Sequence, residues 1–287
     1  MKKGLFIGLT TVDIQYFVET WPEPNAKMKT GAPVLAAGGP AANAAIAFSF
    51  LGGEAHFVSC IGKNALSDLL FSDFKQQQVK VIDVADKQNF DPVLATVVTN
   101  ITNSERTIIT HHPELDHFQY KIPRIDVGSY EFIMIDGFYP EIALPLCQQA
   151  QQKKIPVILD GGSWKPQLSE LLPYVNIAIC SANFMPPACS NIDDAFSFTL
   201  NKGVQLVAVS RGGESIVSTE GEIAVEKVDA IDSLGAGDVL HGAFCWFSDT
   251  NVDFKQALSK AAEVASFSSC YKGTRSWMNV ASALKQQ

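Results

Sequence analysis

The 287-residue sequence has no excess of positive charge. It contains 22 Lys and Arg residues against 30 Asp and Glu residues, which gives a formal net charge of -8. Proteins that bind nucleic acid through its phosphates usually present a basic surface. We therefore expect no nucleic-acid partner.

The chain also lacks a long apolar run and any closely paired cysteines. A membrane-spanning helix needs about 20 predominantly apolar residues, so no membrane partner is expected. The six cysteines are widely spaced, which is typical of a reducing compartment. The apolar run near the N-terminus is short and has no signal-peptide cleavage site before Asp13. These features predict a cytoplasmic protein.

Two common nucleotide motifs, G-x-x-x-x-G-K-[ST] and G-x-G-x-x-G, are absent. P-loop and dinucleotide-binding folds therefore lose their main support. The five histidines form no metal-binding pattern, since His111 and His112 are adjacent and would point to opposite faces of a strand. One of these two is a candidate to reach a substrate, whereas His241 is expected to be a packing or surface residue.

Short apolar runs that end in turn residues predict strands buried on both faces. These runs are residues 5–9, 132–135, 157–159 and 206–209. Helical patterns lie between or after them, at residues 41–51, 143–153, 193–202 and 254–270. The alternation indicates an α/β fold with a mainly parallel sheet.

Residues 12–18 and 93–110 are rich in β-branched side chains, with a turn expected at residues 102–104. They predict a small second sheet, contributed by about residues 12–36 and 92–118, that folds over a single domain of residues 1–287. Ligands of parallel sheets bind beyond the carboxyl ends of the strands. The turns after the predicted strands, including Asp136 and Asp160, should therefore form one functional rim.

The most informative segment is Asp232-Ser233-Leu234-Gly235-Ala236-Gly237-Asp238, which precedes an apolar helical run. The small residues allow backbone N–H groups to approach an anion, and the start of a helix attracts negative charge. A carboxylate there would repel a stored phosphate, but it suits a general base acting on a hydroxyl that attacks phosphorus. Asp238 is that candidate base. The alternative is a helix start that Asp238 merely stabilises.

This segment resembles the D-x-x-G-A-G-D motif of the PfkB, or ribokinase-like, family of sugar and nucleoside kinases. The resemblance implies that Asp238 is the catalytic base and that Gly235, Ala236 and Gly237 stabilise the transferring phosphoryl group. It places Asp232 at the nucleotide site. It further implies a three-layer α/β/α sandwich with a small β-sheet lid, ATP and Mg²⁺ as cofactors, and in some members activation by a monovalent cation.

A second segment, Gly38-Gly39-Pro40-Ala41-Ala42-Asn43, resembles the family's G-G-x-x-x-N element. Gly38 and Gly39 would let a sugar approach the backbone, and Asn43 would bind its hydroxyls. Asp13 stands where similar kinases place another carboxylate for hydroxyl groups. Lys27 is a candidate to meet an anionic substituent. The alternatives are an ordinary turn and helix start, and solvated side chains.

Ser210-Arg211-Gly212-Gly213 is similar to the family's turn beside the nucleotide phosphates. Ser210 and Gly212 are therefore nucleotide-site candidates, with a plain β-turn as the alternative. Residues 272–275 loosely resemble the loop that closes the nucleotide pocket.

Two departures from the family pattern concern the phosphate surroundings. Asn183 matches the first residue of N-x-x-E, but Pro186 occupies the position of the Glu, which puts the handling of divalent metal in question. Asp160-Gly161-Gly162 stands where many members have D-P-N, so only Asp160 is matched.

Together these features predict ATP-dependent phosphorylation of a primary sugar hydroxyl. Residues 38–42, 104–109 and 238–242 look closest to ketohexose kinases such as ketohexokinase and sulfofructose kinase. Asp136-Gly137-Phe138-Tyr139 places an aromatic side chain where an anion-binding member would carry a base such as Arg, so a neutral sugar is expected. The alternatives are a nucleoside kinase and a catalytically weak sugar or nucleotide sensor, the latter motivated by Pro186. Similar kinases often dimerise through the lid, which makes a homodimer an expectation.

Overall fold

The computed structural model describes residues 1–86, 88–113, 120, 122, 124–249 and 252–281. Its larger sheet has the strand order β12-β11-β10-β9-β8-β1-β4-β5. Every neighbouring pair is parallel except β11 and β12. The strands are β1 (Lys3–Ile7), β4 (Glu54–Ser59), β5 (Lys80–Asp83), β8 (Phe132–Ile135), β9 (Val157–Gly161), β10 (Ile177–Ser181), β11 (Leu206–Arg211) and β12 (Glu214–Ser218).

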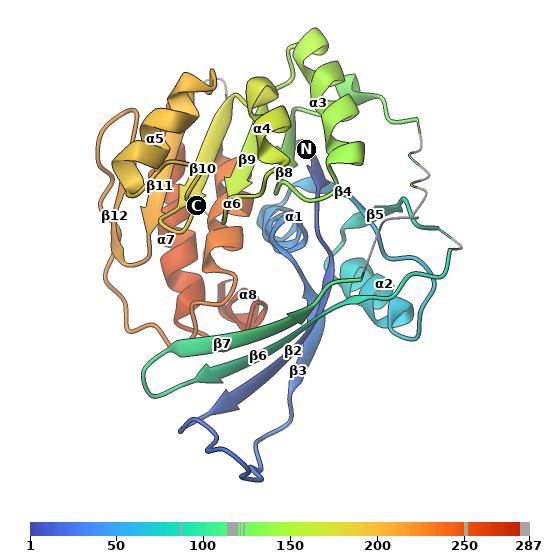
Figure 1. Cartoon of the computed structure of the whole chain (residues 1–287), viewed down its shortest axis with the longest axis vertical. Coiled ribbons are helices and arrows are strands. Elements are labelled where there is room, and N and C mark those ends of the chain that lie inside the picture. The colour runs from blue at the N-terminus through green and yellow to red at the C-terminus, as the bar shows by residue number, and fades with distance from the viewer. Residues whose placement is uncertain (87, 114–119, 121, 123, 250–251, 282–287) are drawn as a thin grey trace.

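Helices cover both faces of this sheet (Figure 1). One face packs against α1 (Pro40–Leu51), α2 (Ser67–Gln76), α6 (Ala236–Phe247), α7 (Phe254–Ser269) and α8 (Ser276–Val280). The other packs against α3 (Pro140–Lys153), α4 (Leu168–Leu171) and α5 (Ile192–Asn201), with the short turns η1 (Val127–Ser129) and η2 (Leu172–Tyr174). No helix among the described residues is both long and apolar enough to cross a membrane.

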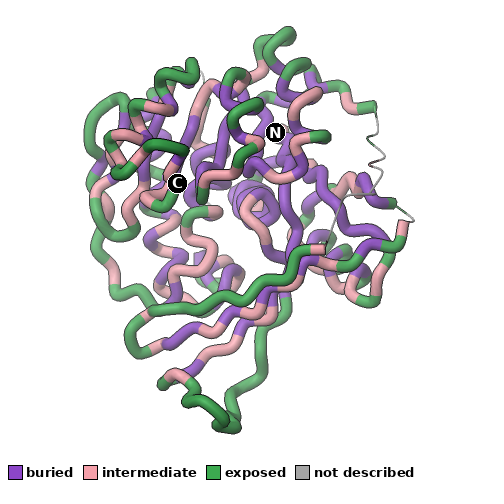
Figure 2. The backbone as a smooth tube through the Cα atoms, in the orientation of Figure 1, coloured by how far each residue is buried: buried purple, intermediate pink, exposed green. Residues whose placement is uncertain are grey.

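Alternation along each strand divides the apolar side chains between two cores. Phe6 of β1 packs in the core beneath α1, whereas its neighbours Leu5 and Ile7 pack on the opposite face. Both faces are therefore dry, as expected for parallel strands with continuous apolar runs. Figure 2 shows the buried backbone running through the centre of the sandwich. The predicted three-layer α/β/α fold is confirmed.

The smaller sheet has the order β3-β2-β6-β7 and projects from one edge of the sandwich (Figure 1). Its strands are β2 (Thr11–Val18), β3 (Val34–Gly38), β6 (Val93–Asn100) and β7 (Glu105–His111). β2 is parallel to β6, and the outer pairs are antiparallel. We call this sheet the lid. Residues 114–118 of the predicted lid range lie outside the described residues. The described strands of the lid span residues 11–38 and 93–111.

The register of the lid defines its two faces. Asp13 of β2 lies opposite Ala36 of β3 and Ala95 of β6, and Ala95 lies opposite Thr110 of β7. Because paired residues share a face, these four side chains form one row. We call the side with Asp13 the inner face and the opposite side, with Ile14, the outer face.

Candidate active site

The site lies where the lid meets the carboxyl ends of the central strands. Asp136 follows β8, Asp160 lies near the end of β9, and Ser210 lies near the end of β11. The predicted rim therefore exists. The first turn of α6, which carries Asp238, faces the same edge of the sheet.

The start of α6 requires glycine and leaves open space above it. Gly235 adopts a left-handed backbone with φ 73°, and a Cβ there would lie 2.8 Å from Thr274 Cγ2. A Cβ on Gly237 would meet no heavy atom within 4 Å. The first N–H groups of a helix have no partner within the helix. This turn therefore offers donors and the positive end of a helix to an anion.

Asn43 of α1 contacts Asp238 directly. Its Nδ2 donates to Asp238 Oδ2 at 2.7 Å, and its Oδ1 accepts from Arg275 Nη1 at 2.9 Å. A guanidinium only donates hydrogen bonds, so Arg275 fixes which end of the amide faces Asp238. Arg275 is fixed in turn by donating to Ala37 O at 2.6 Å and by Asp73 at 3.6 Å.

The pKa of Asp238 is raised well above its ordinary value. Burial is the largest cause, and the negative charge of Asp160 is the next. The carboxylates of Asp13 and Asp136 act in the same direction, while the hydrogen bond from Asn43 opposes them. This shift brings the pKa of the carboxyl group closer to the pKa of an effective general base.

Asp13 occupies a space that only glycine leaves open on the neighbouring strand. A Cβ at Gly38 would lie 2.1 Å from Asp13 Oδ2. Asp13 is 5% exposed and accepts a hydrogen bond from Thr11 Oγ1 at 2.5 Å. Burial raises its pKa, and the Thr11 hydrogen bond opposes that shift. Gly39 has φ 103°, and a Cβ there would meet Leu9 O at 2.2 Å.

Asp136 has a connecting role. Its carboxylate accepts hydrogen bonds from the backbone N–H groups of Leu9 at 2.9 Å, Ala41 at 3.2 Å and Phe138 at 3.0 Å. It therefore ties the end of β8 to the β1–β2 connection and to the start of α1. Burial raises the pKa of this carboxyl group.

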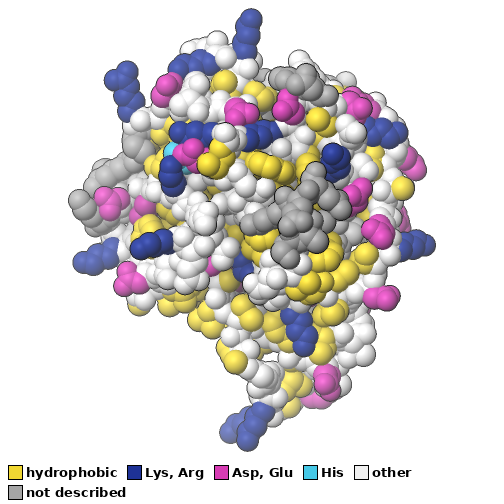
Figure 3. Space-filling view, turned by 180° about the vertical axis from the view of Figure 1, so that it is seen from behind, with side chains coloured by type: hydrophobic (Ala, Val, Ile, Leu, Met, Phe, Trp, Pro, Cys, Tyr) yellow, Lys and Arg dark blue, Asp and Glu magenta, His cyan; other side chains and the backbone are white. Residues whose placement is uncertain are grey.

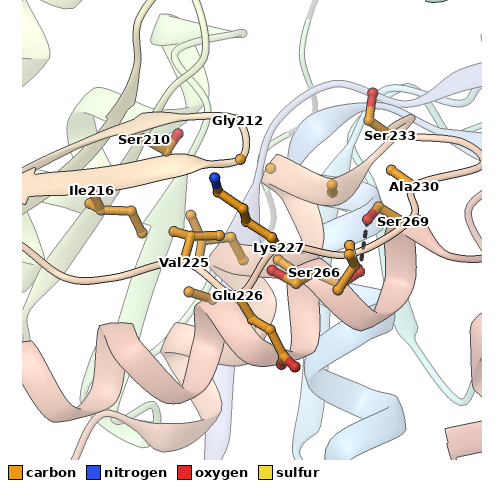
Figure 4. Close-up of a pocket in the computed structure, with 17 residues that line it drawn as sticks. Ser210, Gly212, Ile216, Val225, Glu226, Lys227, Ala230, Ser233, Ser266 and Ser269 are labelled. Carbon is orange, nitrogen blue, oxygen red and sulfur yellow. Dashed lines mark hydrogen bonds between the residues drawn. The ribbon is translucent and has the colours of Figure 1, made fainter. Parts of the chain in front are cut away.

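A pocket of about 420 Å³ adjoins the first turn of α6 (Figure 4). Its lining includes Ser210 and Gly212 from the β11–β12 hairpin and Ala236 and Gly237 from the first turn of α6. Figure 4 shows Lys227 extending toward Gly212. Small residues of α7 form a further wall: Ala262, Ala265, Ser266 and Ser269.

Three predicted site residues lie elsewhere. Asn183 and Asp232 are not among the residues that line this pocket. Asp232 is buried and accepts from the backbone N–H groups of Leu234 at 3.0 Å and Gly273 at 2.8 Å, so it joins two loops. Lys27 lies in the exposed loop at the far ends of β2 and β3, away from Asp13, and the structure does not bring it to the site.

The lid hairpin contacts the segment that leads into Gly235. The Ser104 hydroxyl donates to the carbonyl of Ala230, and the guanidinium of Arg106 donates to the Ser233 hydroxyl. Both Ala230 and Ser233 line the pocket of Figure 4. The lid is therefore connected to the pocket as well as to Asp13.

Sequence reasoning missed several charged residues around the site. Arg275 was grouped with a loop that closes the nucleotide pocket, but it contacts Asn43, a predicted sugar-binding residue. Lys165 places its ammonium 4.6 Å from the centre of the Phe138 ring and donates to Asp136 O at 3.1 Å. Their partners are distant in sequence, so a local motif held no signal for them.

Comparison with known proteins identifies the family. Residues 1–280 match the family described as pfkB family carbohydrate kinase. The chain is 23% identical over 283 residues to ketohexokinase of Mus musculus, covering 92% of this chain and 95% of that protein. It is also 23% identical over 307 residues to a nucleoside kinase of Methanocaldococcus jannaschii, covering 100% and 98%.

Among solved structures, ribokinase of Thermotoga maritima superposes with a TM-score of 0.76 at 20% identity, covering 100% of this chain and 99% of that one. The family predicted from the two glycine-rich motifs is confirmed, and the chain belongs to the pfkB family of carbohydrate kinases.

Proposed function

We propose that this protein transfers the γ-phosphoryl group of ATP to a primary hydroxyl of a sugar, with Asp238 as the general base. The observation that carries the proposal is the position of Asp238. It lies beside Gly237, which lines the pocket of Figure 4, and it is hydrogen-bonded to Asn43 of α1, the helix that follows strand β3 of the lid.

In the proposed reaction, Asp238 accepts the proton of the sugar hydroxyl. The hydroxyl oxygen forms a bond to the γ-phosphorus, and the bond between that phosphorus and the bridging oxygen of ADP breaks. The backbone of Gly235, Ala236 and Gly237 and the start of α6 would stabilise the negative charge on the transferring group.

ATP would enter as its Mg²⁺ complex. Within the described ranges no group of three or more His, Cys, Asp or Glu side chains is arranged to hold a metal ion, and Pro186 brings no carboxylate to the β10–α5 loop. With so few protein ligands, the site fits a Mg²⁺ ion that keeps several waters and is held chiefly by the phosphates of the substrate. The ion would neutralise phosphate charge during transfer.

For the acceptor we propose a neutral ketohexose or similar sugar. Asp13 and Asn43 supply polar groups for hydroxyls, and Gly38 and Gly39 allow close approach. Phe138 still favours a neutral sugar, although Lys165 brings a cation next to its ring. The acceptor panel therefore includes anionic sugars, since turnover with these alone would contradict a preference for neutral sugars.

One cavity favours a nucleoside as the second candidate acceptor. A space of about 590 Å³ is lined by Leu9, Val93, His112, Phe138 and Tyr139, among others. Val93 lies two residues before Ala95, which is paired with Asp13, so this cavity begins about 7 Å from the Asp13 row. Its aromatic faces suit a planar base.

The test is ADP release with Mg-ATP against ketohexoses, aldohexoses, pentoses, polyols, nucleosides and anionic sugars. Turnover that is highest with a neutral ketohexose supports the first candidate, and turnover that is highest with a nucleoside replaces it with the second. Thermal stabilisation by ATP and a sugar without any ADP release would instead favour a sensor.

We also propose that the protein forms a homodimer through the outer face of the lid. β7 is exposed along its whole length, as Figure 2 shows. Leu35, Ile14, Thr96 and Ile109 form one row across that face, and Ile109 is 67% exposed. Exposed apolar rows of this kind favour association with a partner.

A further inference from the structure

We propose that His241 is a positioning residue for the phosphoryl transfer, which holds the first turn of α6 in place and neutralises the Asp160 carboxylate beside the general base. The inference rests on the role proposed for Asp238. His241 is not among the residues that line the pocket of Figure 4. Neither of its described hydrogen bonds is to Asn43.

The imidazole joins three elements. His241 is 4% exposed, and its Nδ1 lies 2.7 Å from Gly237 O in the first turn of α6. Its Nε2 lies 2.9 Å from Ile179 O in β10. The Oδ2 atom of Asp160, in β9, lies 3.5 Å from the same Nδ1. The ring therefore anchors the start of α6 to two central strands.

These contacts specify the charge on the ring. A carbonyl oxygen only accepts hydrogen bonds, and a neutral imidazole has a single N–H. Donation to both Gly237 O and Ile179 O would take two N–H groups, so the proposal gives the ring a positive charge. Asp160 Oδ2 is buried without a hydrogen bond of its own. A buried carboxylate needs a charged partner, and His241 supplies it.

The hydrogen bond to Gly237 O also orients a catalytic peptide group. That carbonyl belongs to the peptide that links Gly237 to Asp238, so its N–H is the backbone donor of Asp238 at the start of the helix. Fixing the carbonyl fixes the direction of this donor and the position of the Asp238 side chain. A change at His241 should therefore reduce kcat more than it affects the KM for ATP.

The charge has a second, measurable effect. Asp160 is the charged neighbour that contributes most to the raised pKa of Asp238. Removing the positive charge of His241 leaves Asp160 unneutralised, which should raise the pKa of Asp238 further. Removing the charge of Asp160 should lower it. The two changes therefore act in opposite directions on the pH at which the base becomes protonated.

Other titratable groups surround this pair. They are Asp13 and Asp136 near Asp238, Arg275 across Asn43, and the thiols Cys180 of β10 and Cys245 of α6. The thiols have pKa values raised by burial, with Asp160 adding to the shift in both. The thiols stay neutral across the pH range of the assay, and the carboxylates of Asp13 and Asp136 are unchanged in every variant below.

The experiment measures kcat against pH for wild type, His241→Gln, Asp160→Asn and the double variant, with the best acceptor of the panel. We expect His241→Gln to lower kcat at least tenfold at pH 7, with the KM for ATP within about threefold of wild type. The acidic limb of its pH profile, where kcat falls as the base becomes protonated, should move to higher pH. The acidic limb of Asp160→Asn should move to lower pH. In the double variant the limb should follow Asp160→Asn.

His56→Gln is the matched control, because His56 lies on β4, where it contacts Glu54 and Tyr130. It should leave both kcat and the acidic limb unchanged. Acidic limbs that coincide with wild type in His241→Gln, or that move in the same direction in both single variants, would overturn the proposal.

A second measurement does not depend on the folding of a variant. Nitrogen NMR of wild type labelled in the histidine rings should show both nitrogens of His241 protonated at pH 7. A single protonated nitrogen would overturn the proposal. If Asp238→Asn keeps full activity, the proposed function itself fails. If that variant is inactive but the His241 results are negative, only the present inference fails.

Discussion

Asp238 lies within reach of three other carboxylates, those of Asp13, Asp136 and Asp160, each of which raises its pKa. Such crowding opposes the charged form of the base. A carboxyl group whose pKa is raised by folding adds stability while it stays protonated and loses that contribution as the pH rises through the raised pKa. The proposed catalytic residue should therefore reduce stability at neutral and alkaline pH.

Asp238→Asn tests this at the residue scale. The amide is neutral at every pH and keeps the shape of the side chain. Relative to wild type, the variant should gain stability as the pH rises from 4.5 to 8.5, by about 1.4 kcal/mol for each pKa unit of the upward shift, or roughly 3 °C in Tm. Thermal unfolding across this range is the measurement, and a difference that stays constant would contradict the raised pKa.

Gly38→Ala tests the acceptor side. The added methyl group would lie 2.1 Å from Asp13 Oδ2, so it should displace that carboxylate. We expect the KM for the acceptor to rise at least tenfold while the KM for ATP changes less than threefold. Gly31→Ala is the control, because nothing lies within 4 Å of its added Cβ. Equal effects of both substitutions on the acceptor KM would refute this role for Asp13.

At this scale the sequence predicted what lies within one short segment. The run from Gly235 to Asp238 contains the turn that begins α6 as well as the proposed base, so its pattern could be recognised within one segment. The contact of Arg275 with Asn43 joins positions 232 residues apart, and no pattern within either segment specifies it. Lys27 shows the opposite case. It is close to Gly38 in the sequence, but the structure does not place it near that residue.

At the scale of elements, the lid hairpin is the part with a testable function. β6 and β7 carry Arg106 onto Ser233, just before the first turn of α6. A closed lid excludes water, which competes with the sugar for the phosphoryl group. The hairpin should therefore control the ratio of ADP released to sugar phosphate formed.

Arg106→Ala is expected to lower kcat/KM for the acceptor about tenfold to a hundredfold. Because water enters more easily, the ratio of ADP to sugar phosphate should rise above one. Thr107→Ala is the control, since Thr107 is exposed and lies on the outer face. A ratio that remains at one in Arg106→Ala would show that the hairpin does not protect the reaction from water.

Strands with strongly apolar runs were predicted well, and β8 has the predicted bounds. β1 ends at Ile7, before the predicted apolar run ends, and the chain then leads into β2 of the lid. Gly8 lies in this connection, where a Cβ would be 2.2 Å from the carboxylate of Asp136. β5 was not predicted. Its four residues lie at the sheet edge and are not fully buried, so its sequence lacks the continuous apolar run of a central strand.

At the scale of the whole molecule, the surface bears on assembly. Seen from behind, Lys and Arg side chains are interspersed with Asp and Glu, and hydrophobic side chains are frequent in the lower half, toward the lid (Figure 3). Leu35 is 49% exposed and Ile109 is 67% exposed on the outer face of the lid. A second copy covering this face would remove both from water.

Ile109→Asp tests the proposed dimer. Wild type should sediment as a dimer at micromolar concentration, and the charged variant should shift to the monomer because it places an unpaired charge in an apolar interface. Thr107→Asp, on the same strand and face, shows whether a charge farther along β7 has the same effect. A wild-type protein that stays monomeric at all concentrations would refute the proposal.

The sequence established the family and the order of layers because both follow from motifs and apolar periodicity spread along the chain. It could not establish the acceptor. The cavity beside Asp13 is assembled from Leu9, Val93, His112 and Phe138, which come from separate segments. Its shape depends on how the lid sits on the sandwich, and that arrangement is a property of the whole molecule.

The most direct test of the account is the rate of ADP release by Asp238→Asn with Mg-ATP and the best acceptor of the panel. Loss of the proposed general base should lower kcat by about 10²-fold to 10⁴-fold, while ATP still protects the variant against thermal unfolding. A variant that binds ATP and phosphorylates the acceptor at the wild-type rate would contradict the assignment of Asp238, and with it the proposed mechanism.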